Sequence, residues 1–504
     1  MTDGGGAQDA GLAVRTESGA VSGVAASGGV RIFRGLPFAA PPVGELRWRP
    51  PELPAKWSGV RAATEFGPDC PQPAPPPGGP SSSRAGRQSE DCLSLNIWAP
   101  PYAKGGETYP VMVWLFGGSF LVGSASDILF DGEKYARQGV ILITANYRVG
   151  LFGFLAHPAL TAESPHHSSS NYALLDQLAA LRWIRDNIAN FGGDPNRVTV
   201  FGVSAGSASI SLLLTSPLAK GLFQQAILES AGALRPLASL AEAENYGAKL
   251  GDDLATLRRM SAEEVLSKTP LFVPKMRGLT APRVLRPIRD GWIIPKDERD
   301  AFAAGEFVNI PVIVGTNADE GTNFVVTWPI RTLDEYRAFV AENFGADAAL
   351  ALHTYPARDE ASVRQRVAEL FADTQFNYGG WALARALARS ERGVWRYLFL
   401  KRRPGQSDGP HHGGEVAYVF GALGAPHLGK IAPFDAGDEK LSDAMMAAWV
   451  RFARFGDPSG GGLTWPRYDP AKDEYLEFGD PIRVGSRWRR RNMEFLDGFF
   501  ERRK

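Results

Sequence analysis

One serine stands where a strand would turn sharply into a helix. Residues 198–209 read VTVFGVSAGSAS; the first three are β-branched and predict a strand, and the small residues after Ser204 predict a helix. Gly202 and Gly206 flank the serine, where a Cβ would collide with the neighbouring strand or helix. Such a turn would expose the Ser204 hydroxyl for nucleophilic attack, although the pattern alone also fits a plain glycine-rich turn.

A serine hydroxyl is a poor nucleophile at neutral pH and needs a base within hydrogen-bond reach. When the nucleophile lies on such a turn, the order along the chain is serine, acid, histidine. That order excludes the three histidines before Ser204. His353 lies in an alanine-rich helical stretch, whereas His411 and His412 stand in a glycine-rich loop after an expected strand. We therefore expect the base to come from this loop.

The acid that orients the base should also follow a strand. The expected strand 310–315 is followed by TNADEG (316–321), in which Asp319 and Glu320 both qualify by position. A solvated acidic turn is the alternative interpretation. From the residues alone the choice between the two carboxylates stays open.

Negative charge that develops on a carbonyl oxygen during attack needs hydrogen-bond donors. The segment GGS (117–119) follows an expected buried strand, and its backbone N–H groups could act beside that of Ala205. Each preorganised donor of this kind lowers the barrier by roughly 3–4 kcal/mol. Serine, acid, histidine and donors thus occur in the order that nucleophilic catalysis at such a turn requires.

Strands and helices alternate along the chain and predict an α/β fold with a large, mostly parallel central sheet flanked by helices. Apolar positions three and four residues apart predict an amphipathic helix over 172–191. A last strong helix is expected over 442–455. Segments 235–305 and 330–390 are expected to be mainly helical excursions above the sheet. Strands are expected at 93–100, 111–116, 140–147, 198–201, 226–229, 310–315 and 395–400.

We expect one domain over 1–504, with a disordered leader at 1–12. The leader is polar and has no apolar signal core. Lys and Arg together number 55, as do Asp and Glu, so nothing in the charge suggests binding to nucleic acid or an anionic membrane surface. No apolar run of about 18 residues occurs, and no membrane span is predicted.

The chain has two cysteines, Cys70 and Cys92. They could be two unrelated buried thiols or one disulfide. The loop between them is rich in proline, glycine and serine and could pack little core, so a covalent bridge would stabilise it by about 3 kcal/mol. We favour the disulfide, and with it an oxidising compartment, secreted or periplasmic, over the cytoplasm.

Several segments resemble motifs of the type-B carboxylesterase/lipase family, the cholinesterase-like branch of the α/β-hydrolases, which includes bacterial carboxylesterases. FGGDPNRVTVFGVSAG (191–206) resembles the family's serine signature, and EDCLSLN (90–96) resembles its second signature. NYRVG (146–150), DQ (176–177) and WPRY (465–468) are further matches. The resemblance covers nearly the whole chain and implies an α/β-hydrolase fold and carboxylic ester hydrolysis.

The resemblance also implies roles for particular residues. The nucleophile would be Ser204, the acid would be Glu320 of an N-x-D-E-G turn, and the base would be His412, which precedes G-x-E. Three backbone N–H groups would donate to the oxyanion. Other matches imply a disulfide, a serine near the acid and a structural ion pair. The donors are those of Gly118, Ser119 and Ala205; the other matches are Cys70 with Cys92, Ser230, and Arg47 with Glu90.

The chain departs from the family pattern at three places. Ser119 stands where glycine is usual, which keeps the backbone donor but narrows the pocket or adds a hydroxyl donor. Val203 stands before the nucleophile, where glutamate is usual. The loop between the cysteines has no aromatic residue, whereas choline-specific relatives place a tryptophan there for cation–π contact. A choline ester is therefore not the expected substrate.

We interpret the sequence as that of a serine carboxylesterase that cleaves a small-molecule ester through an acyl-enzyme, with no metal or organic cofactor. A lipase acting on longer-chain acylglycerols is the alternative among enzymes, although the polar loop 70–92 is a poor candidate for its lid; amidase activity with the same residues also stays open. An adhesion or binding module that has lost catalysis is the alternative from another class. The intact triad argues against it. Monomer and dimer both stay open.

Overall fold

The computed structural model describes residues 12–74, 82–251, 253–274, 276, 278–403, 406, 408–425, 428 and 433–503. The expected leader over 1–12 lies outside these residues except for Leu12. No helix in the described ranges is long and apolar enough to cross a bilayer.

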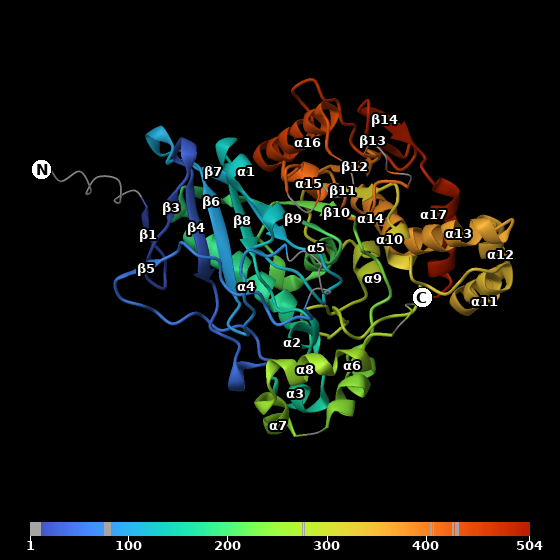
Figure 1. Cartoon of the computed structure of the whole chain (residues 1–504), viewed down its shortest axis with the longest axis horizontal. Helices are drawn as coiled ribbons and strands as arrows, with labels where there is room; N and C mark the ends of the chain where they lie inside the picture. The colour runs from blue at the N-terminus through green and yellow to red at the C-terminus, as the bar shows by residue number, and fades with distance from the viewer. Residues whose placement is uncertain are drawn as a thin grey trace, which may run out of the picture.

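Within the described residues, an 11-stranded sheet runs through the centre of the molecule in the order β14-β13-β12-β11-β10-β9-β7-β8-β6-β4-β3 (Figure 1). The pairings from β13 to β8 are parallel, and those at both edges are antiparallel. The mostly parallel sheet is therefore confirmed. The strands are β3 (Val24–Ala25), β4 (Arg31–Pro37), β6 (Ser94–Ala99), β7 (Tyr109–Leu115), β8 (Ile141–Ala145), β9 (Gly193–Val203), β10 (Gln225–Glu229), β11 (Val312–Asn317), β12 (Val394–Phe399), β13 (Glu474–Phe478) and β14 (Arg483–Ser486).

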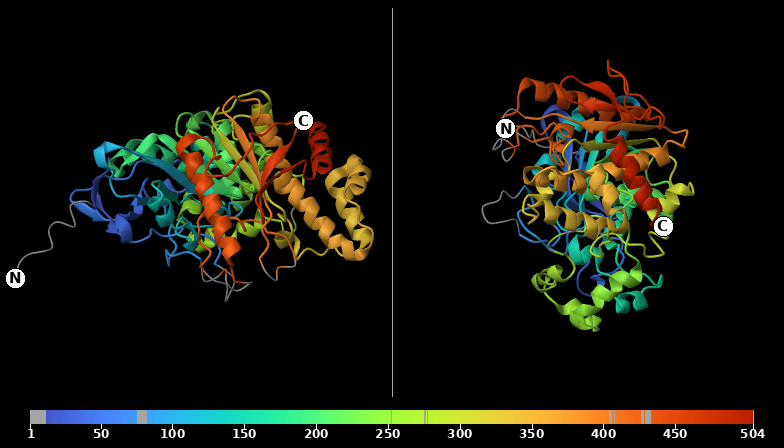
Figure 2. Two further views of the ribbon diagram at one scale, coloured as in Figure 1. Left: turned by 90° about the horizontal axis from the view of Figure 1, so that it is seen from above. Right: turned by 90° about the vertical axis from the view of Figure 1, so that its right-hand side faces the viewer.

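The central strands are largely apolar and buried because helices cover both faces of the sheet. Figure 2 shows α16 on one face and α4 with α5 on the other. A small separate sheet and several short helices pack around this central sheet and its covering helices. The long helices are α4 (Tyr172–Asn187), α5 (Ala205–Thr215) and α16 (Ala436–Phe455); the small sheet is β1 (Ala13–Arg15), β2 (Ala20–Ser22) and β5 (Val60–Ala62); the short helices are α1 (Glu133–Arg137), α2 (Gly150–Phe154), α3 (Pro158–Glu163), α10 (Thr322–Val325) and α15 (Val416–Val419).

Two helix boundaries differ from the sequence prediction. The helix expected over 172–191 starts as predicted, but its last turn, Ile188–Phe191, is a tighter 3₁₀ turn. The helix expected from 442 starts earlier, at Ala436, because the Asp435 side chain accepts hydrogen bonds from the backbone N–H groups of Gly437 and Asp438. Charged residues fill the first turns of this helix, so its apolar pattern becomes visible only later in the sequence.

The expected helical excursion over 330–390 is present and has a hydrophobic core of its own (Figure 1, right). In the described residues this second cluster is distinct from the main core around the sheet. Its members include Phe339, Phe344, Val367, Phe371 and Phe499. The helices that enclose it are α11 (Leu333–Phe344), α12 (Ala348–Thr354), α13 (Glu360–Ala372), α14 (Tyr378–Leu387) and α17 (Arg490–Glu501).

The prediction that 235–305 is mainly helical is wrong for its second half. Short helices occur up to residue 271, but the described residues between 273 and 297 form no helix. Prolines at 274, 282, 287 and 295 each remove a backbone donor and clash with a preceding turn. The helices are α6 (Leu240–Gly247), α7 (Leu254–Arg259), α8 (Ala262–Ser267) and α9 (Glu298–Ala303).

A disulfide joins Cys70 to Cys92, as expected. It fixes a segment that in turn holds the loop after β7. The backbone N–H of Gly123 donates to Gln72 Oε1 at 2.8 Å, and Gln72 Nε2 donates to the Gly123 carbonyl oxygen at 2.9 Å. The bridge therefore stabilises more than its own loop.

This bridge gives a simple expected result. Denatured, unreduced protein should show no reactive thiol, and reduced protein should show two. The double substitution Cys70→Ser, Cys92→Ser should lower the free energy of unfolding by about 3 kcal/mol, because the unfolded chain regains the freedom that the closed loop removes. Thiol titration and urea denaturation measure the two effects. Two thiols in the unreduced protein would contradict the assignment, and the double variant, with none in either state, is the control.

Candidate active site

Ser204 is the single residue between the end of β9 and the start of α5. Its φ of 58° and ψ of −115° are costly for a residue with a side chain, and such strain persists where the surrounding structure enforces it. A Cβ on Gly202 would come within 2.4 Å of the Leu115 carbonyl oxygen, and one on Gly206 within 1.9 Å. The close approach of β7 thus requires both glycines, as expected.

His412 lies in the loop after β12, with Nδ1 2.5 Å from Glu320 Oε2. A carboxylate only accepts hydrogen bonds, so Nδ1 carries the proton and Nε2 offers a lone pair. Nε2 is buried and accepts no hydrogen bond from any described residue. The rings of Phe376 and Phe324 pack on the imidazole, with centroids 4.2 and 5.1 Å away. Both phenylalanines line the pocket that also contains Ser204.

Glu320 is fully buried and its carboxylate is held by three donors. Oε1 accepts from the Ser230 hydroxyl and from the Asn317 backbone N–H, both at 2.6 Å, while Oε2 accepts from His412. These contacts fix the carboxylate in one orientation toward the imidazole. Ser230 thus contacts Glu320, as the family resemblance implies.

The neighbouring pair, Asp319 and His411, is turned elsewhere. Asp319 Oδ1 accepts from the backbone N–H groups of the next turn, and Oδ2 lies 3.8 Å from His411 Nε2. His411 Nε2 also lies 3.2 Å from Asp408. Of the two carboxylates that the residues alone left open, Glu320 is the one that contacts His412.

Two further buried carboxylates, Glu415 and Glu229, lie behind Glu320. Asn317 Nδ2 donates to Glu415 at 2.5 Å, and Trp449 Nε1 donates to Glu229 at 2.9 Å. Burial, with the charge of Glu320, raises the pKa of Glu415 to about 7. Burial, with the charge of Glu415, raises the pKa of Glu229 well above its usual value. Sequence reasoning missed Glu229, whose one signal is a carboxylate ending an otherwise apolar strand.

The loop after β7 lies against Ser204. Gly118 has a φ of 116° and Ser119 one of 59°, and a Cβ on Gly117 would come within 3.1 Å of the Ser204 Cβ. Among the described backbone contacts, the N–H groups of Gly118, Ser119 and Ala205 donate to no other group. These three N–H groups, two in the loop and one at the start of α5, are thus available as donors.

Buried contacts of the segment 146–150 hold this loop in place. The Tyr147 hydroxyl donates to the carbonyl oxygen of Phe116 at 2.5 Å, and the Gly150 N–H donates to that of Phe120 at 2.7 Å. Arg148 donates to both carboxylate oxygens of Asp176, at 2.8 and 2.7 Å. The NYRVG and DQ motifs therefore have a positioning role.

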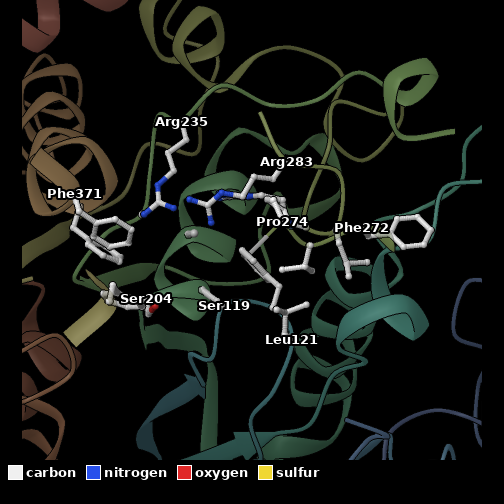
Figure 3. A pocket seen from close by; sticks show the side chains of 17 residues that line it. Ser119, Leu121, Ser204, Arg235, Phe272, Pro274, Arg283 and Phe371 are labelled. Atoms are coloured by element: carbon white, nitrogen blue, oxygen red, sulfur yellow. The ribbon is translucent and has the colours of Figure 1, made fainter. Parts of the chain in front are cut away.

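A pocket that opens to solvent lies beside Ser204. Figure 3 shows Ser204 and Ser119 on one side of it, with Arg235 and Arg283 on the opposite side. Five phenylalanines belong to its apolar wall.

Comparisons with known proteins agree over nearly the whole chain. The model of the carboxylesterase family matches residues 10–496. Fumonisin B1 esterase of Sphingopyxis macrogoltabida is 47% identical over 481 residues, which cover 94% of this chain and 87% of that protein. Para-nitrobenzyl esterase of Bacillus subtilis (strain 168) is 37% identical over 489 residues, covering 94% and 95%. A solved PNB esterase structure matches with a TM-score of 0.83 and 33% identity, covering 96% and 100% of the two chains.

Proposed function

The chain belongs to the carboxylesterase family and is a carboxylic ester hydrolase, and from this premise we propose that it cleaves small esters through an acyl-enzyme on Ser204. The observation that carries the proposal is the pairing of His412 with a fully buried Glu320 behind the pocket of the strained serine. The names of the two relatives specify different esters, so they support the reaction class rather than one substrate.

In the acylation step, Ser204 Oγ attacks the ester carbonyl carbon while His412 Nε2 takes the hydroxyl proton. Glu320 accepts from Nδ1 and stabilises the imidazolium that forms. The tetrahedral intermediate then collapses: the ester C–O bond breaks, and the alcohol leaves with the proton from His412. The acyl group stays bound to Ser204.

In the deacylation step, water takes the place of the alcohol. His412 removes a proton from the water, whose oxygen attacks the acyl carbon, and the collapse returns the proton to Ser204 Oγ as the acid leaves. No cofactor is needed for either step.

Gly118, Ser119 and Ala205 are the proposed oxyanion donors. A substitution at Ser119 tests whether its backbone N–H or its hydroxyl donates to the oxyanion. Glycine readily adopts a φ of 59°, so Ser119→Gly keeps the backbone N–H while it removes the hydroxyl. We expect kcat/KM for p-nitrophenyl acetate to change less than about tenfold, compared with the 10²–10³-fold loss typical when a donor is removed. A loss of that size would show that the hydroxyl itself is the donor.

A p-nitrophenyl acyl series from C2 to C16 tests the proposed reaction and separates the esterase from the lipase. We expect hydrolysis with an initial burst of p-nitrophenol, as an accumulating acyl-enzyme gives, and highest kcat/KM at short chains. A preference for long, emulsified chains would favour the lipase. Absence of hydrolysis across the series would contradict the proposed function.

We further propose an oxidising location, secreted or periplasmic. The support is the Cys70–Cys92 disulfide, since such bridges persist mainly outside the reducing cytoplasm. The state of the two thiols in protein taken directly from the producing cells tests this assignment.

A further inference from the structure

Three arginines, Arg235, Arg283 and Arg286, line the pocket beside Ser204. Among the described residues that line this pocket there is no aspartate or glutamate. Attack on an ordinary ester requires the serine, its base and the oxyanion donors, and none of these is an arginine. Like charges also repel one another strongly where water is scarce. The concentration of guanidinium groups therefore indicates a site for an anion.

Arg235 and Arg283 come from distant parts of the chain, yet one residue, Gln375, holds both. Arg235 Nη2 donates to the main-chain carbonyl oxygen of Gln375, and Arg283 Nη2 donates to its side-chain oxygen. The Gln375 amide is itself fixed, because Nε2 donates to the Leu279 carbonyl oxygen at 2.8 Å, and the residue is only 2% exposed. Gln375 therefore orients both guanidinium groups.

Gln375 lies in a π-helical turn, Asp373–Asn377, between α13 and α14. Turns of this kind are rare and often occur at functional sites. The next residue, Phe376, connects this turn to the catalytic centre: the Arg235 guanidinium lies 5.0 Å from its ring centroid, and the His412 ring lies 4.2 Å away. The arginine pair is thus separated from the proposed base by one aromatic ring.

The surrounding residues leave space for these cations and add to their charge. A Cβ on Gly232 would come within 3.1 Å of Arg235 Nη2, so glycine there gives the guanidinium room. Arg286 lies 5.5 Å from the ring centroid of Phe120, in the loop of the proposed oxyanion donors. Figure 3 shows the guanidinium groups of Arg235 and Arg283 turned toward each other across from Ser204.

We propose that this pocket selects esters whose acyl part keeps a free carboxylate, such as monoesters of dicarboxylic acids, and that Arg235 and Arg283 bind that carboxylate. The inference rests on the proposed role of Ser204 in the same pocket. A guanidinium group matches a carboxylate with two parallel N–H···O bonds. The anchored carboxylate presents the ester carbonyl to the serine, and it stays bound through the acyl-enzyme until water releases the diacid.

A matched pair of substrates tests this selection. Monoethyl adipate is an anion at pH 8, whereas ethyl 6-amino-6-oxohexanoate has a neutral amide in place of the carboxylate. We expect kcat/KM to be at least about tenfold higher for the anion, a difference of about 1.4 kcal/mol. The same comparison is made with the monoethyl esters of the diacids from succinate to suberate, each paired with the ester in which an amide replaces the free carboxylate. It identifies the acyl length at which the preference is largest.

Variants then show whether the arginines cause the preference. Arg235→Gln and Arg283→Gln should each lower the anion-to-amide ratio of kcat/KM about tenfold, and Arg283→Lys should restore part of it by keeping the charge. Gln375→Glu should also lower the ratio while all three arginines remain, because it places a carboxylate against Arg283. Arg337→Gln is the control: this exposed arginine on α11 pairs with Asp334, and its loss should leave the ratio unchanged.

The outcomes distinguish this inference from the proposed function. Equal kcat/KM for the two esters at every acyl length, or a ratio that neither Arg235→Gln nor Arg283→Gln lowers, would overturn the carboxylate site while ester hydrolysis itself stands. Titration of active sites with a p-nitrophenyl phosphate triester counts the correctly folded molecules in each preparation. Wild-type protein that hydrolyses neither ester, nor any member of the p-nitrophenyl series, would contradict the proposed function instead.

Discussion

Ser204→Ala should reduce kcat for p-nitrophenyl acetate by roughly 10⁴- to 10⁶-fold, as removal of the serine nucleophile does in serine hydrolases. The substitution removes the proposed nucleophilic atom, and His412, the proposed base, then has no hydroxyl proton to accept. The small residual rate should come from the oxyanion donors alone. Steady-state and burst kinetics measure the loss, and the burst should disappear completely.

The matched control for this substitution is Ser207→Ala, one turn further along α5. Ser207 is fully buried, so Ser207→Ala removes a hydroxyl from the same helix while it leaves the proposed catalytic residues in place. We expect Ser207→Ala to keep activity within a few-fold of wild type and to melt at a similar temperature. A Ser204→Ala protein that is folded and still shows the burst would refute the assigned nucleophile.

Glu320→Gln should reduce kcat by about 10⁴-fold, as replacing the acid of a triad by its amide does elsewhere. The amide keeps one acceptor oxygen for the Ser230 hydroxyl and the Asn317 N–H. Its NH₂ group then faces His412 Nδ1, donor against donor. The imidazole must move its proton to Nε2 or turn away, and in both cases it no longer accepts the proton of Ser204.

The adjacent Asp319→Asn is the control, since Asp319 lies near His411 instead. The amide oxygen can still accept from the backbone of the turn, so we expect activity within about tenfold of wild type. The two substitutions lie at adjacent positions. Comparing their kcat values therefore shows which of the two carboxylates orients His412. A large loss in Asp319→Asn with little loss in Glu320→Gln would exchange the two roles.

The turn that carries Ser204 could be predicted from the sequence because every feature that defines it is local. Gly202, Ser204 and Gly206 lie within five positions, and β-branched residues precede them. The acid was harder. Asp319 and Glu320 are adjacent carboxylates, and which one contacts the histidine depends on donors from Ser230 and Asn317. Only the family resemblance named Glu320 in advance.

The arginine pair could not be predicted from sequence. Arg235, Arg283 and Gln375 meet across separations of 140 and 92 residues, and no spacing rule connects them. The segment that carries Arg283 was expected to be helical, but its prolines prevent a helix. The π-helical turn that carries Gln375 likewise lies inside a stretch whose apolar pattern is that of ordinary helix. Tertiary contacts rather than local preferences decide both.

The second hydrophobic cluster separates pocket shape from catalysis in a way that suits protein engineering. Phe324, Phe371 and Phe376 belong to or pack against this cluster and also line the pocket, whereas Ser204 is carried by the sheet and its own core. Substitutions within the helical cover can therefore reshape the acyl site while the strands that carry the nucleophile keep their packing. The division holds for Phe371, whereas Phe324 and Phe376 also pack on His412. A lineage, or a directed-evolution library, can therefore explore new esters at Phe371 with the least risk to the reaction.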